Sequence, residues 1–290
     1  MSDSIPPQAV RKLPVWDCIR KAHACVLGQP VLLLKAMVSP CLVFILLSSV
    51  WGQLMRLDGS GDGGLSSVAR FFLIHLPFYT YFGVAWHRLT LLGNEMGRPL
   101  LLPRLRRRHF EFFALSVVVS LVVLLASYLA EQIGELNLVG LARELASQEL
   151  PFAGIAALFG YLLLLNSLFL GVPYLIFRFS FVFPAAAVDE PYGLTHSWRH
   201  TRNQGLRLLL VGVAVGLPIL LFSMGLKAVV FQLQAADGTP LVSSKYFGSL
   251  LIWRLIQVIL HFMTIALVVS AISLAFKACT GWVPAKNQPR

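Results

Sequence analysis

Charged side chains are scarce in this 290-residue chain. Asp, Glu, Lys and Arg make up 13% of the residues and apolar side chains make up 57%, whereas soluble domains average roughly 25% and 45–50%. A water-soluble fold of this length could not bury so much apolar surface without a very large core, but a bilayer solvates it directly. The charges also gather between long uncharged runs, which is typical of a membrane-spanning protein.

Acidic residues are scarcer than basic ones, with 13 Asp and Glu against 24 Lys and Arg. The net charge of +11 could indicate nucleic-acid binding, but no soluble domain is available to present it, so we expect no nucleic-acid partner. The simpler interpretation is a set of cytoplasmic loops held at an anionic lipid surface. The candidate contacts to lipid headgroups are Arg104, Arg106, Arg107, Arg108, Arg199 and Arg202.

Cysteine is also sparse. Cys18, Cys25, Cys41 and Cys279 fall in segments that we expect in or facing the cytoplasm, or inside lipid, so no disulfide framework is predicted. The first long apolar run begins only near Val31, and no small-residue cleavage site follows promptly, so we expect no cleavable signal peptide.

Six segments are long enough to cross a bilayer, because about 20 mainly apolar residues in a helix traverse a core about 30 Å thick. The fourth is interrupted by Gly171 and Pro173 and stays apolar to Ala187, so we expect one helix, kinked or broken at Pro173, with a tail at the interface. The six segments lie near Val31–Leu54, Val68–Leu92, Phe110–Ile133, Phe152–Phe177, Leu206–Leu233 and Leu250–Phe276.

Basic residues predict the orientation. The N-terminal segment, the second and fourth connections and the C-terminal tail hold 17 Lys and Arg, whereas the opposite side holds six. The excess places both chain ends in the cytoplasm, which requires an even number of spans. We therefore predict an all-α polytopic membrane bundle of about six transmembrane helices, N-in and C-in. Its membrane domain covers 14–276, between a disordered tail at 1–13 and a cytoplasmic tail at 277–290.

Three amphipathic stretches outside the spans are predicted to form helices on the membrane surface. They are Pro14–Leu27, Asn137–Leu150 and Tyr192–Gly205. In the first, Val15, Cys18, Ile19, Ala22, Cys25 and Val26 share one apolar face.

Polar side chains inside the spans are few. They could converge on one site between helices, or they could simply hydrogen-bond neighbouring helices together. No span carries a carboxylate near its middle, which weakens a proton- or sodium-driven transporter. The candidate intramembrane polar residues are His75, Asn166, Gln257 and His261. In the fifth span, Gly212 and Gly216 favour close helix packing, within the chain or to a partner.

No motif predicts catalysis, a cofactor or a metal ion. His196 and His200 have a zinc-compatible spacing but lack further ligands, and Arg199 and Arg202 beside them oppose a cation. Residues 59–62 match the G-x-G-D string of intramembrane aspartyl proteases, yet they lie in a polar connection without a second intramembrane carboxylate.

Two motifs carry a family resemblance. They are Ala85–Gly93 (AWHRLTLLG) and Arg178–Ala187 (RFSFVFPAAA) followed by Ser197–Arg202 (SWRHTR). The chain resembles uncharacterised bacterial inner-membrane proteins and, more distantly, the membrane domain attached to some glycerophosphodiester phosphodiesterases. The resemblance implies a six-span helical fold in a bacterial cytoplasmic membrane. The catalytic domain of those phosphodiesterases has no counterpart here, so their activity is not implied.

Three function classes follow. We favour a non-enzymatic envelope protein that binds anionic membrane lipids, or a protein partner or second copy. A small-solute transporter or channel with a polar site between helices is the alternative. An enzyme acting on lipid headgroups is the third class, which only the cytoplasmic Arg and His cluster suggests.

Overall fold

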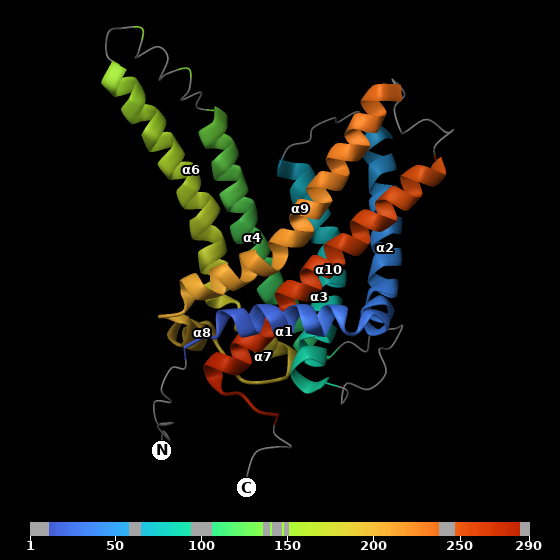
Figure 1. The fold of residues 1–290 in the computed structure, drawn as a ribbon, viewed down its shortest axis with the longest axis vertical. Coiled ribbons are helices and arrows are strands. Elements are labelled where there is room, and N and C mark those ends of the chain that lie inside the picture. The colour runs from blue at the N-terminus through green and yellow to red at the C-terminus, as the bar shows by residue number, and fades with distance from the viewer. Residues whose placement is uncertain are drawn as a thin grey trace.

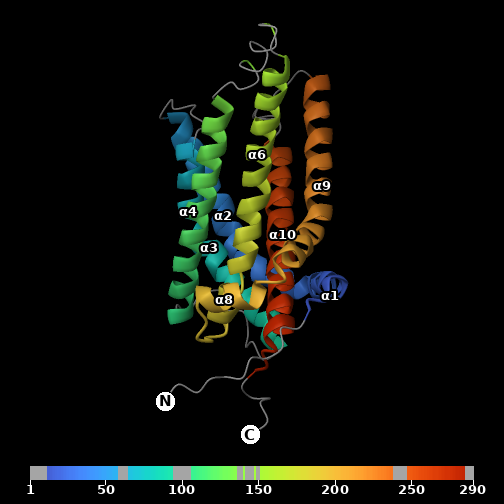
Figure 2. The ribbon, with the colours of Figure 1, turned by 90° about the vertical axis from the view of Figure 1, so that its left-hand side faces the viewer.

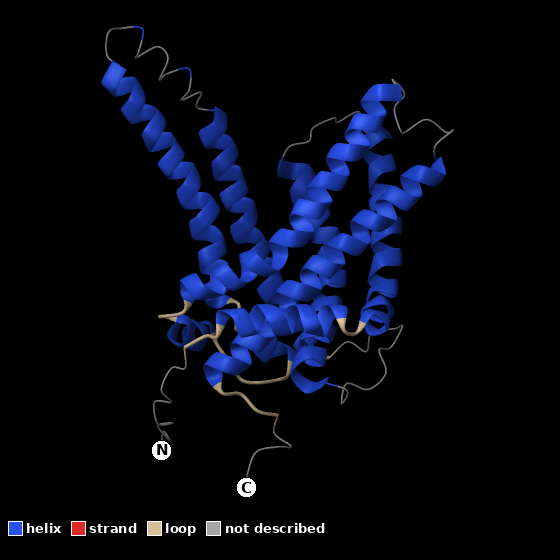
Figure 3. Ribbon diagram, in the orientation of Figure 1, coloured by secondary structure: helices blue, strands red, loops and turns tan. Residues whose placement is uncertain are grey.

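The computed structural model describes residues 12–57, 65–93, 106–135, 140, 147, 151–237 and 247–284. Within these ranges the chain is helical apart from short connections, without a strand (Figure 3). The predicted all-α class is therefore confirmed. The helices are α1 (Val15–Leu27), α2 (Pro30–Leu57), α3 (Leu65–Leu92), α4 (Arg107–Glu135), α6 (Pro151–Phe179), α7 (Val182–Ala187), α8 (Leu194–Thr201), α9 (Gly205–Asp237) and α10 (Phe247–Thr280).

A long helix stands at each of the six segments predicted to span. Among the described residues, four stretches are long and apolar enough to cross a membrane: Arg107–Ala130, Phe159–Ala187, Gly205–Val230 and Leu255–Thr280. Large apolar side chains cover their outer faces, and Leu121, Phe159 and Leu221 are each more than half exposed. Water would penalise such a continuous apolar exterior, whereas lipid hydrocarbon does not. These helices indicate a membrane protein.

The long helices share one end where the short helices gather. Figures 1 and 2 show α1, α7 and α8 together with the last residues of α10 at this end, and α1 lies across the long helices. We call this part of the molecule the base. It comprises residues 12–28, 86–93, 106–112, 174–207 and 275–284.

Two apolar segments of the base pack against protein. Cys18, Ala22 and Val26 of α1 are buried, and α1 contacts α9 and α10. Helix α7 is buried against α3 and α4. Side chains of other helices therefore cover the apolar face of α1 and the tail ending at Ala187, and their predicted place at the membrane interface stays a prediction. The predicted surface helix 137–150 lies outside the described residues except at 140 and 147.

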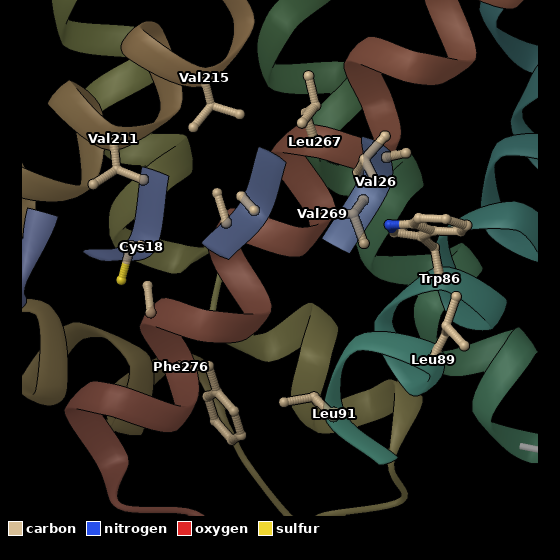
Figure 4. Packing of buried hydrophobic residues seen from close by; sticks show 14 of the residues in the cluster. Cys18, Val26, Trp86, Leu89, Leu91, Val211, Val215, Leu267, Val269 and Phe276 are labelled. Atoms are coloured by element: carbon tan, nitrogen blue, oxygen red, sulfur yellow. The ribbon is translucent and has the colours of Figure 1, made fainter. Parts of the chain in front are cut away.

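The apolar core is concentrated in and just above the base, around α10. Figure 4 shows Cys18 of α1 beside Val211 of α9, and Val26 beside Leu267 of α10 and Trp86 of α3. Helix α10 is the most enclosed of the four candidate spans, with 39% of its most apolar stretch buried, against none of that of α6. Helix α10 therefore lies at the centre of the packing, in contact with α1, α2, α3 and α9, and α6 stands at the periphery.

Of the paired glycines Gly212 and Gly216 in α9, Gly212 allows close packing within the chain. A methyl group on Gly212 would overlap the ring of Phe177 in α6, whereas one on Gly216 would meet only a methyl of Thr264, at 3.9 Å. The absence of a side chain at residue 212 lets α6 and α9 approach closely, as small residues do between membrane helices.

Gly212→Ala should therefore destabilise the protein by about 1–3 kcal/mol through overpacking, while Gly216→Ala should be nearly neutral. Thermal unfolding of both variants in detergent checks this. Phe177→Ala in the Gly212→Ala background should recover part of the loss, because it removes the ring that clashes. Equal melting temperatures for the two alanine variants would contradict the packing.

Candidate functional site in the charged base

A polar seam between α3 and α10 positions the base. Trp86 Nε1 donates a hydrogen bond to Ser270 Oγ at 2.8 Å, and His87 Nδ1 lies 2.7 Å from Ser273 Oγ. Trp86, His87 and both serines are buried. Because each polar group is costly in an apolar surrounding unless it is paired, these bonds fix the register of the two helices. The seam holds the next residue, Arg88, at the edge of the base.

Arg88 joins an ion cluster that links three elements. Its Nη1 donates to the carbonyl oxygen of Ala187 at 2.9 Å and lies 3.9 Å from Asp189 Oδ2. Nη1 of Arg108, in the first turn of α4, lies 2.7 Å from the same Oδ2. Two guanidinium groups thus share a single carboxylate where α3, α4 and the end of α7 meet.

The position of Asp189 follows from the end of α7. Asp189 has a positive φ of 60°. The N–H of Glu190 bonds to the oxygen of Ala185 at 2.9 Å and that of Asp189 to the oxygen of Ala186 at 3.3 Å. This is the Schellman pattern, in which a residue in the left-handed region closes a helix. The turn holds the carboxylate facing Arg108.

A second corner of the base is built around Arg178, in the last turn of α6. Its side chain is buried and donates to Thr201 Oγ1 at 3.1 Å, to Tyr174 Oη at 3.1 Å and to the carbonyl oxygen of Trp198 at 2.9 Å. The guanidinium also lies 3.6 Å from the centroid of the Trp198 ring, a cation–π contact. Ser197 Oγ donates back to the carbonyl oxygen of Arg178 at 2.9 Å. These bonds attach α8 to α6.

The remaining cations of the base face outward. Within the described ranges the base carries twelve Lys and Arg but only four carboxylates, those of Asp17, Glu111, Asp189 and Glu190. Nine of the twelve cations are exposed: Lys12, Arg20, Lys21, Arg106, Arg107, Arg199, Arg202, Arg207 and Lys277. Among the described residues at the opposite ends of the long helices the charges nearly balance: Arg56, Arg70, Lys227 and Arg254 stand there with Glu131, Glu135 and Asp237.

The six predicted headgroup residues divide between these environments. Arg106, Arg107, Arg199 and Arg202 are exposed on the base. Arg108 is buried, with 7% of its side chain exposed, and its partner in this structure is Asp189. Arg104 lies outside the described residues.

The described members of the predicted intramembrane polar set contact different neighbours. His261 Nε2 lies 2.9 Å from the hydroxyl of Tyr79 on α3, and Gln257 Oε1 accepts from Ser223 Oγ of α9 at 3.4 Å. Asn166 is exposed on the peripheral helix α6, which packs mainly on α4, α9 and α8. His75 belongs to α3, and its side chain lies outside the described part. The arrangement favours helix-to-helix bonding over a shared polar site.

The two histidines of α8 contact an aromatic ring. The ring of Tyr192 stacks on His200 with centroids 5.8 Å apart, and the Tyr192 hydroxyl lies 2.9 Å from His200 Nδ1. Burial raises the pKa of Tyr192, so its hydroxyl stays protonated at neutral pH. Among the described residues no group of three or more His, Cys, Asp or Glu side chains is arranged to hold a metal ion.

Sequence reasoning missed the roles of Asp189 and Arg178 within the base. Both lie in or beside the two motifs that carry the family resemblance, and the fold brings these motifs together. Comparison with protein-family models, curated proteins and solved structures finds no match to this chain. The resemblance therefore stays a prediction.

Arg178→Gln should destabilise the base by about 1.5–3 kcal/mol, the usual value for hydrogen bonds to a charged group. Arg178→Lys should rescue it poorly, because an ammonium cannot reproduce the planar fork and the stacking on Trp198. Limited proteolysis across α8, combined with thermal unfolding, measures this. The matched control is Arg199→Gln, since Arg199 is an exposed neighbour on α8. If the two Gln variants destabilise the protein equally, the bonds of Arg178 do not attach α8 to α6.

Proposed function

We propose that the chain is a six-span protein of the bacterial cytoplasmic membrane whose base faces the cytoplasm and binds anionic lipid headgroups, without enzymatic chemistry of its own. The observation that carries the proposal is the twelve-to-four excess of cations over carboxylates at the base, next to helices with an apolar exterior. Cations at the cytoplasmic surface meet a negative lipid potential, and each contributes about 1 kcal/mol to binding. The bacterial setting is inferred from the resemblance of the two motifs.

The geometry supports binding more than transport. The polar residues inside the long helices bond to different neighbours, as Gln257 does to Ser223 and His261 to Tyr79. The basic groups of the base, by contrast, are mostly exposed at one end. Trp16, 81% exposed on α1, adds an aromatic side chain of the kind that is enriched at membrane–water interfaces.

The orientation is tested with reporters. A fluorescent protein that folds only in the cytoplasm, fused after Arg290, should be bright in bacterial cells, because positive charge is retained on the cytoplasmic side. The same reporter inserted in the connection 238–246 should be dark, and an alkaline phosphatase inserted there should be active. A dark C-terminal fusion with normal expression would refute the topology.

Lipid binding is tested by neutralising exposed cations. The double variant Arg199→Gln/Arg202→Gln should lose about 2 kcal/mol of affinity for phosphatidylglycerol, the sum of two surface charges. Native mass spectrometry of the detergent-solubilised protein, titrated with phosphatidylglycerol or phosphatidylcholine, measures the loss.

The matched control neutralises two cations at the opposite ends of the helices, as Arg56→Gln/Lys227→Gln. This variant should keep the wild-type preference for the anionic lipid. If both double variants bind phosphatidylglycerol as the wild type does, the proposed function is wrong.

A further inference from the structure

The ion cluster at Asp189 has more positive charge than its one carboxylate can balance. Arg88 and Arg108 both contact Asp189 Oδ2, at 3.9 and 2.7 Å. The guanidinium of Arg106 interacts electrostatically with Arg88 and adds a third cation. The nearest described acid on α4, Glu111, already pairs with Arg107 at 2.7 Å. The cluster therefore holds three guanidinium groups and one carboxylate, an excess of two positive charges.

Burial makes this excess significant. Arg108 has 7% of its side chain exposed, and a buried cation is stable only when it is paired and hydrogen-bonded. Its Nη1 lies 2.7 Å from Asp189 Oδ2 in an ion pair whose geometry is unfavourable for a hydrogen bond, and it has no other partner in the part of the chain that the structure describes. The cluster thus combines surplus charge with a buried guanidinium that Asp189 satisfies only in part.

The cluster also has an open side. The Asp189 side chain is 56% exposed, Arg88 is partly exposed and Arg106 is exposed. An anion can therefore approach the guanidinium groups from the aqueous face of the base. The first turn of α4 begins at Arg107, so the positive end of that helix dipole adds to the attraction.

We propose that Arg88, Arg106 and Arg108 form a discrete binding site for a phosphate group, with Asp189 as an internal carboxylate that occupies it in the absence of ligand. Phosphate suits the site because it carries one to two negative charges and accepts paired hydrogen bonds from guanidinium forks. The phosphate comes from a lipid headgroup or from a free anion. The headgroup version deepens the proposed function and rests on it, whereas the free-anion version does not.

The decisive variant is Asp189→Asn. Asparagine tolerates the positive φ of this turn and keeps the shape of the side chain, while it removes the negative charge that competes for the guanidinium groups. Without added phosphate the variant should melt below the wild type, because Arg108 loses its counter-ion. Phosphate should then restore its stability and bind about tenfold or more tightly than to the wild type.

The experiment uses the full chain in nanodiscs and two separate probes. In phosphatidylcholine nanodiscs, inorganic phosphate is titrated and melting temperatures are recorded, with chloride at matched ionic strength as reference. In a second series the nanodiscs contain phosphatidylglycerol. Tighter binding of inorganic phosphate assigns a free anion as ligand, and a gain only with phosphatidylglycerol assigns a headgroup; either supports the site.

A second pair of variants tests the site even if Asp189→Asn fails to fold. Arg106 is exposed, and Arg106→Gln should weaken phosphate binding about tenfold. The neighbouring Arg107 is 91% exposed and paired with Glu111, so Arg107→Gln should leave phosphate binding unchanged. No gain in Asp189→Asn, or equal binding by the two Arg variants, overturns the site. The proposed function would still stand if neutralising Arg199 and Arg202 weakened binding of anionic lipid.

Discussion

Helices α3 and α10 run side by side in the same direction, and polar bonds join them at increasing positions along both: Tyr79 to His261, Trp86 to Ser270 and His87 to Ser273. In hydrocarbon the hydrophobic effect does not drive helices together, so close packing and hydrogen bonds must do so. The remaining structure depends on this pairing. Helix α10 also contacts α1, α2 and α9, and α3 presents Arg88 to the base.

The base separates two uses of positive charge. Arg178 and Arg108 are buried and act as connectors, one binding α8 to α6 through neutral acceptors, the other binding α4 to α7 through Asp189. Other cations of the base, such as Arg199 and Arg202, are exposed. An exposed cation keeps its hydration and can meet an anionic surface, whereas a buried one must find partners within the fold. Composition alone cannot distinguish the two.

The polar residues whose bonds are described in the long helices pair with different neighbours. Gln257 and His261 stand one turn apart on α10, yet one bonds to α9 and the other to α3. Such bonds stabilise helix pairs by roughly 0.6 kcal/mol each and need no solute. The distinctive chemistry among the described residues therefore lies at the base.

The sequence by itself determined the helical class, the places of the six long helices and the asymmetry of charge, since hydrophobic run length and Lys and Arg counts are local properties. Only the tertiary structure decided which apolar faces meet protein: that of α1 packs on α9 and α10, and α7 packs on α3 and α4. It also decided that Arg108 belongs with Asp189, 81 positions away along the chain. Such pairings depend on how helices pack in space, which run length and periodicity do not encode.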